Sequence, residues 1–115
     1  MVQIRTIAVD FTEGQSIYPM LRFELANLSV GLLVNNVGMD VPFGPFVELQ
    51  PEEEIEKIIN CNIMSMARLT NLLLPGMRKK QRGIIINVGS IWGTGSTPWA
   101  TLYGATKVII FFKKS

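Results

Sequence analysis

The sequence has 115 residues, of which 48% are hydrophobic, and its formal net charge at pH 7 is +2. This length predicts one domain at most, and a hydrophobic fraction this high argues against intrinsic disorder. The chain contains no histidine and a single cysteine, Cys61. These counts exclude Ser-His-Asp and Cys-His nucleophilic schemes and an internal disulfide bond, and we expect no metal site.

No apolar run approaches the roughly 18 residues of a membrane-spanning helix, so no membrane segment is expected in this sequence. Nor do the first six residues form the apolar core of a signal peptide. A cluster of cations occupies residues 78–82. It either binds nucleic acid or a membrane surface, or it forms a solvated helix end, where cations complement the helix dipole. We favour the helix end and expect no nucleic-acid partner, because no aromatic residues are interleaved with the cations.

The first part of the chain predicts strand, helix and strand in turn. Ile4 to Phe11 contains a short continuous apolar run, which predicts a strand buried on both faces, as in a parallel sheet. Ser16 to Leu28 has apolar residues at helical spacing and predicts a helix, with Pro19 in its first turn. Val30 to Asn36 predicts a second buried strand, which is followed by a turn that Gly38 permits.

The middle of the chain predicts a loop and a long helix. Met39 to Gln50 contains prolines and apolar residues, and this loop either covers a substrate or packs on the next helix. A helix is predicted from residue 51 to 75, because Pro51 suits its first position and acidic residues follow at its positive end. Its apolar stripe is either core or interface, and Pro75-Gly76 is expected to bend or end it. Asn62 lies on that stripe, where a buried amide needs hydrogen-bond partners.

The last part of the chain predicts a third strand, a loop and a helix. Gly83 to Gly89 is rich in β-branched residues and leads to Ser90. A loop from Ile91 to Thr101 contains two tryptophans that suit a substrate wall, and a helix is predicted from Leu102 to Phe112. The whole order is β-α-β-α-β-α, which predicts right-handed crossovers and an α/β fold with a parallel sheet. Ligands of such sheets bind at the carboxyl ends of the strands.

Tyr103 and Lys107 are four residues apart, so in a helix they lie one turn apart on the same face. An ammonium group close to a phenol favours the phenolate, and such a tyrosine exchanges a proton with a carbonyl or an alcohol near neutral pH. The same spacing also fits a half-buried tyrosine beside a lysine whose alkyl chain is buried. Ser90 favours the chemical interpretation, because its hydroxyl can hold a substrate oxygen at the end of a strand.

Five short motifs follow one another along the chain: Val9-Asp10-Phe11, Leu33-Val34-Asn35-Asn36-Val37-Gly38, Asn60-Cys61-Asn62-Ile63, Ile86-Asn87-Val88-Gly89-Ser90 and Tyr103-Gly104-Ala105-Thr106-Lys107. With these motifs in this order, the chain resembles the short-chain dehydrogenase/reductase family over roughly residues 7–112. The sequences of Val34 to Met39 and of Leu74 to Met77 most resemble the branch of 17-beta-hydroxysteroid dehydrogenases and very-long-chain 3-oxoacyl-CoA reductases.

The resemblance implies a partial Rossmann-like, doubly wound parallel sheet, formed by family strands 3, 4 and 5 with their helices in a single truncated domain over residues 1–115. It also implies an oxidoreductase that reduces a ketone, or oxidises an alcohol, of a steroid or a long-chain 3-oxoacyl-CoA. In that reaction Tyr103 is the proton donor or acceptor and Lys107 tunes it. Ser90 orients the carbonyl, and Asn62 holds a water that relays protons; a structural bridge to backbone is the alternative for this amide.

The implied cofactor is NADP or NAD, with NADPH favoured. By resemblance, Asp10 lies beside the adenine, although the same side chain also suits a helix cap. The stretch that contains Asn35, Asn36 and Gly38 runs along the ribose and nicotinamide, close to Tyr103 and Lys107. The implied substrate is small and lipophilic, and full-length members of this branch usually work at the endoplasmic reticulum.

The sequence also departs from the family, since the glycine-rich turn Thr-Gly-x-x-x-Gly-x-Gly that binds the cofactor pyrophosphate is absent. In the family order, two further strands lie between strands 3 and 4. Without them Ile4 to Phe11 has no neighbour, and Val30 to Asn36 exposes an apolar edge. A second hypothesis is therefore a catalytically inactive fragment, cytoplasmic if it exists alone, that forms a homodimer through the helix of residues 51–75.

Overall fold

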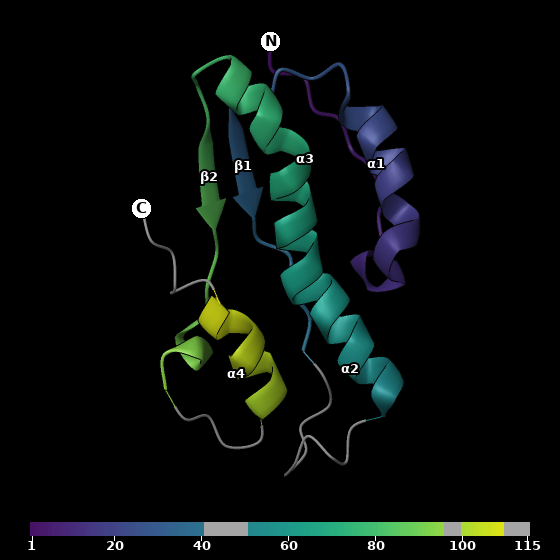
Figure 1. Cartoon of the computed structure of the whole chain (residues 1–115), viewed down its shortest axis with the longest axis vertical. Coiled ribbons are helices and arrows are strands. Elements are labelled where there is room, and N and C mark those ends of the chain that lie inside the picture. Colours follow the sequence, from purple (N-terminus) through teal and green to yellow (C-terminus); the bar gives the residue numbers. More distant parts are fainter. Residues whose placement is uncertain (41–50, 96–99, 110–115) are drawn as a thin grey trace.

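The structure is a computed structural model that describes residues 1–40, 51–95 and 100–109 (Figure 1). Its two strands, β1 (Leu32–Asn35) and β2 (Ile84–Asn87), pair in parallel, with Leu32 opposite Ile84 and Asn35 opposite Asn87. The helices that accompany them are α1 (Tyr18–Leu25), α2 (Glu52–Ile59), α3 (Ser65–Lys79) and α4 (Thr101–Val108). This alternation around a parallel pair confirms the predicted α/β class.

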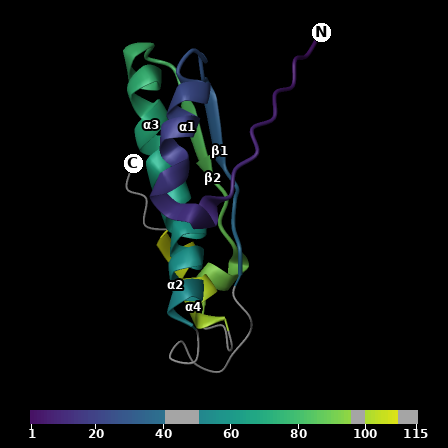
Figure 2. The same ribbon diagram turned by 90° about the vertical axis from the view of Figure 1, so that its right-hand side faces the viewer.

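The sheet is covered on one face only within the described part of the chain. Figure 2 shows α1 and α3 on the same side of β1 and β2. Leu33 is buried, whereas its neighbours along β1 are exposed. Side chains alternate along a strand, and the opposite face carries exposed aliphatic residues. They are Leu32, Val34, Ile84 and Ile86. The prediction that these strands are buried on both faces is therefore wrong for the described chain.

The prediction of a strand over Ile4 to Phe11 is also wrong. Residues 1–10 have no regular structure, and a 3-10 stretch runs over Phe11–Ile17. The physical reason is that no described strand lies beside residues 4–10 to complete a ladder, as expected from the two family strands that the sequence lacks. Three apolar residues of this segment still pack against a buried cluster. The cluster is Ile17, Tyr18 and Leu21, and the residues packed on it include Ile7, Val9 and Phe11.

The predicted helices form, but their ends differ. The first has Pro19 in its initial turn, as expected, and ends at Leu25 rather than Leu28. The second does not end at Pro75-Gly76 but continues to Lys79. The proline removes one helical N–H, and the carbonyl four residues earlier belongs to the exposed Asn71, where water can replace the lost bond. The last helix begins at Thr101 and ends at Val108, and the part predicted for residues 110–112 lies outside the described residues.

A π-helical turn over Asn60–Met64 joins α2 to α3. A turn of this kind adds one residue to a helical turn, and it often occurs at functional sites. Here it directs Cys61 and Asn62 into the interior. Ile58, one turn earlier, is 0% exposed, so this part of the predicted apolar stripe is core. No helix among the described residues is both long and apolar enough to cross a membrane.

Two glycines allow α4 to lie directly against the short 3-10 turn Ile91–Gly93. A Cβ atom on Gly104 would stand 2.9 Å from the carbonyl oxygen of Trp92. A Cβ atom on Gly93 would stand 2.8 Å from the backbone carbonyl carbon of Lys107. Because the atoms that each Cβ would meet belong to the backbone, they cannot rotate away as a side chain can. Any larger residue at either position would therefore push the turn away from the helix.

We therefore expect Gly104→Ala to destabilise the fold by about 1–3 kcal/mol through overpacking. Gly76→Ala, the same change in α3, is the matched control, because a Cβ atom there meets nothing within 4 Å. It should stabilise the fold by about 0.5–1 kcal/mol through helix propensity. Urea unfolding of the two variants measures the difference, and equal midpoints would contradict the close contact at Gly104.

Candidate active site

A cavity of about 340 Å³ opens where the chain leaves the carboxyl ends of β1 and β2. Gly38, Met39 and Asp40 line it after β1, and Ser90 and Trp92 line it after β2. Tyr103 completes the wall from α4. This is the edge of a parallel sheet at which α/β folds bind ligands, as the sequence predicted.

The Tyr103–Lys107 pair forms as the helical spacing predicted. The Nζ atom of Lys107 lies 5.5 Å from the centroid of the Tyr103 ring, within the range of a cation–π contact. Lys107 is only 5% exposed, and no carboxylate of the described residues lies within 4.0 Å of its Nζ. A buried ammonium group without an anionic partner is costly, so its place beside the tyrosine and the cavity is unusual for a purely structural lysine.

Gly38 makes room for this ammonium group. A Cβ atom at residue 38 would lie 2.8 Å from the Nζ of Lys107 and 3.6 Å from the Oδ1 of Asn62. The absence of a side chain therefore lets the turn after β1 lie directly on the lysine. Gly38 is itself exposed and lines the cavity.

Asn62 connects that turn to α4. Its Nδ2 donates to the Met39 carbonyl and its Oδ1 accepts from the Met39 N–H, each at 2.8 Å. Nδ2 also donates to the Thr106 hydroxyl at 3.0 Å, and that hydroxyl donates to the Tyr103 carbonyl at 2.7 Å. Asn62 and Thr106 are both buried, so the amide acts as the bridge to backbone that the sequence left open. The proton relay stays a prediction.

Ser90 and Trp92 fix the opposite wall. The Oγ of Ser90 accepts a hydrogen bond from the Trp92 N–H at 3.3 Å and caps the 3-10 turn. The indole ring meets the Tyr103 ring edge to face, with centroids 6.3 Å apart and planes at 87°. Since the serine oxygen is the acceptor in its bond to the backbone, its own O–H remains available for a ligand in the cavity.

Five of the predicted site residues do not line the cavity: the buried Lys107 and Asn62, and Asp10, Asn35 and Asn36. Asp10 caps the 3-10 stretch, and hydrogen bonds from the Thr12 hydroxyl and N–H lower the pKa of its carboxyl group. Asn35 donates to the Asn87 side chain at 2.8 Å, which ties β1 to β2. Asn36 is exposed after the strand. The capping interpretation of Asp10 is thus confirmed, and the cofactor contacts of Asp10, Asn35 and Asn36 stay predictions.

Two residues that hold the site together were not predicted from the sequence. Met39 acts through its backbone N–H and carbonyl, for which side-chain chemistry gives no signal. Thr106 acts through its side chain, and a signal existed: it lies three residues after Tyr103, on the same side of the helix.

Burial raises the pKa of the neighbouring Cys61 thiol, with the Asp10 carboxylate adding to the rise and Lys107 opposing it, so this thiol remains protonated at neutral pH.

The fold and this site define a chain of the short-chain dehydrogenase class. The family model described as short chain dehydrogenase matches residues 1–112, and the chain belongs to that family. It is 42% identical over 113 residues to very-long-chain 3-oxoacyl-CoA reductase of Homo sapiens, and the aligned residues make up 96% of this chain and 36% of that relative. The same enzyme of Anas platyrhynchos is 40% identical over 111 residues, 95% of this chain and 36% of that relative. The chain thus spans 36% of the length of these curated relatives.

Solved structures agree in fold. A bulky-bulky ketone specific alcohol dehydrogenase from Comamonas testosteroni superposes with a TM-score of 0.81 at 30% identity, over 92% of this chain and 42% of that one. A short-chain dehydrogenase from Sphingobium yanoikuyae in complex with NADPH gives 0.78 at 32% identity, over 90% and 40%. A 3-oxoacyl-[acyl-carrier protein] reductase with bound NAD from Brucella melitensis gives 0.75 at 26% identity, over 90% and 40%. These matches confirm the family resemblance and the Rossmann-like fold class.

Proposed function

We propose that this chain carries the proton-transfer site of an NAD(P)-dependent short-chain reductase that acts on the ketone of a long-chain 3-oxoacyl thioester. The observation that carries the proposal is the arrangement around one cavity. Ser90 and Tyr103 line it together, while Asn62 and Lys107 are buried, the lysine in contact with the Tyr103 ring. The names of the relatives support the substrate class, and the solved relatives with NADPH or NAD support the cofactor class.

The residues around the cavity fit the nicotinamide end of such a cofactor. Gly38 lines the cavity with exposed backbone, and the ammonium group of Lys107 lies against it with donors that no carboxylate of the described residues engages. The hydroxyl of Tyr103 supplies a further donor for a ribose. When bound, the cofactor would supply the hydride for the carbonyl carbon. The sequence contains no glycine-rich phosphate turn, so the proposal concerns the nicotinamide end alone.

Within this proposal each side chain has a separate task. The O–H of Ser90 donates a hydrogen bond to the carbonyl oxygen of the substrate, and the Tyr103 hydroxyl gives that oxygen its proton. Lys107, 5.5 Å from the ring, stabilises the negative charge left on the tyrosine oxygen. Asn62 keeps the geometry, because it joins Met39 on one side of the cavity to the helix of Tyr103 on the other.

Substrate choice can be tested on the 115-residue chain itself. We expect the loss of NADPH absorbance to depend on a long-chain 3-oxoacyl-CoA, and to be slower with a 17-ketosteroid, the alternative that the resemblance left open. A faster reaction with the steroid would reverse this order. No turnover of either substrate by a folded chain would contradict the proposal for this chain.

The same protein preparation tests a second candidate function, in which the chain associates without catalysing a reaction. It is favoured by the uncovered aliphatic face of the sheet and by the exposed Ile59 on the helix of residues 51–75. An inactive, folded dimer in analytical ultracentrifugation would support it. The proposed place of work is the endoplasmic reticulum, by resemblance to full-length members of the branch.

A further inference from the structure

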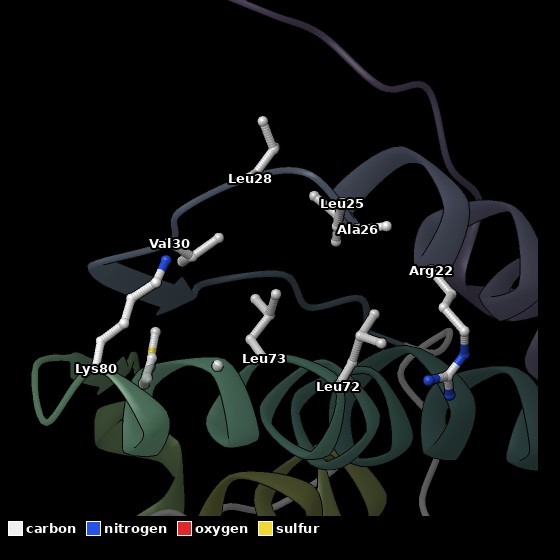
Figure 3. A pocket seen from close by; sticks show the side chains of 10 residues that line it. Arg22, Leu25, Ala26, Leu28, Val30, Leu72, Leu73 and Lys80 are labelled. Carbon is white, nitrogen blue, oxygen red and sulfur yellow. The ribbon is translucent and has the colours of Figure 1, made fainter.

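A second cavity lies at the opposite ends of the strands. Its volume is about 240 Å³, and it lies between α1, the segment that leads into β1, and the last turns of α3. Figure 3 shows leucine side chains of both helices facing one another across it. The reductase proposal does not involve this cavity, because none of its lining residues is shared with the site around Tyr103.

The walls are aliphatic and the ends are cationic. Leu25, Leu28, Val30, Leu72, Leu73 and Met77 form most of the lining. Figure 3 places Lys80 and Arg22 at opposite ends of the row. Among the described residues, no carboxylate lies within 4.0 Å of either cation. An apolar cavity with cations at its mouth and no acid in its lining complements a ligand that has an aliphatic body and a negative head.

The distribution of charge along the sequence strengthens this complementarity. All nine acidic residues precede residue 57, so the segment that contains α3 and its end has none. The one acidic residue of α1, Glu24, is already paired with Arg5. The cluster at residues 78–82 adds further positive charge around Lys80. An anion that approaches this end of the molecule therefore meets a field of one sign.

One end of the cavity is better equipped to hold a head group. The Nζ of Lys80 donates to the Ser29 hydroxyl at 2.6 Å, which leaves two ammonium hydrogens and the hydroxyl hydrogen free to bind one carboxylate. Arg22 stands at the other end without such a partner. Both cations are exposed, so the hydroxyl of Ser29 is what distinguishes the Lys80 end.

We propose that this cavity binds a medium-chain saturated fatty carboxylate, with its head group on Lys80 and Ser29 and its chain between the leucines of α1 and α3. At about 30 Å³ for a group of water size, the volume holds roughly eight heavy-atom groups. With the carboxylate outside the cavity, on Lys80 and Ser29, about eight chain carbons fill it, which corresponds to a fatty carboxylate of about nine carbons. The site is independent of the proposed reductase reaction.

Calorimetric titration of the 115-residue chain with decanoate tests this proposal. We expect binding to one site, with the affinity rising about fourfold per methylene from hexanoate to octanoate, as hydrophobic burial predicts. 1-Decanol, which lacks the charge, should bind at least threefold more weakly. Equal binding of decanoate and decanol would overturn the proposal, because the cations would then have no role.

Substitutions locate the site. Gly76→Leu should abolish binding, because Gly76 lines the cavity and a Cβ atom there meets nothing, so the new side chain fills the space without a clash. Ala67→Leu on the exposed face of the same helix is its control. Lys80→Gln should weaken binding about three- to fivefold, and Arg22→Gln less than twofold. Undiminished binding by folded Gly76→Leu, or a larger effect of Arg22→Gln, would overturn the assignment.

Discussion

Replacing Tyr103 with phenylalanine is expected to lower kcat for 3-oxoacyl-CoA reduction by about 10²–10⁴-fold, the usual contribution of a positioned general acid. The variant loses only the hydroxyl. Its ring keeps the edge-to-face contact with Trp92 and the contact with Lys107. The expected loss is therefore one of proton transfer rather than of folding. Steady-state rates of NADPH oxidation, measured beside the melting curve, separate these two causes.

Tyr18→Phe is the matched control for this experiment. The Tyr18 hydroxyl is buried without a hydrogen-bond partner in the described structure, and its ring packs under the guanidinium of Arg68 at 5.0 Å. Burial also raises the pKa of this phenol, so it remains neutral and unused. Removing it should leave kcat unchanged and keep or raise stability, because an unsatisfied polar group is removed. A Tyr103→Phe enzyme that retains its rate within about threefold would exclude Tyr103 as the acid.

The sequence predicted well those features that depend on a local pattern of residues. The helical spacing of Tyr103 and Lys107 brought the ammonium group to the ring of the tyrosine, and the apolar run before Ser90 placed that serine after a strand. These features follow from the periodicity of helices and from the direction of a strand, which neighbouring elements do not alter.

What the sequence could not predict depends on partners in space. Ile4 to Phe11 has a strand-like pattern, yet a strand forms only where another backbone completes its hydrogen bonds, and no described strand lies beside it. The two strands absent from the family order indicated that this segment has no neighbour, but its own pattern did not. The exposed Ile84 shows the same limit, since β-branched residues indicate a strand but not what covers its faces. The bridge from the Asn62 side chain to the Met39 backbone joins residues 23 apart. The amide indicated a bridge to backbone, but the Met39 side chain carries no sign that its backbone is the partner.

The largest expected effect on stability belongs to that bridge. Asn62→Ala should lower the free energy of unfolding by about 2–4 kcal/mol, because it leaves the Met39 N–H and carbonyl and the Thr106 hydroxyl without their amide partner in a buried place. Since Thr106 also bonds to the Tyr103 carbonyl, the loss extends into α4. Urea unfolding measures the change through the midpoint at constant slope.

Asn60→Ala tests whether the effect belongs to this amide or to any asparagine of the π-helical turn. Asn60 is half-buried and donates one long hydrogen bond, 3.4 Å, to the Thr12 carbonyl. Its removal should cost no more than about 0.5–1 kcal/mol. The two variants carry the same chemical change two residues apart, so helix propensity and lost volume largely cancel in the comparison. Equal losses would mean that Asn62 contributes only as part of the turn, and the cavity around Tyr103 would then owe its shape to packing instead of to this bridge.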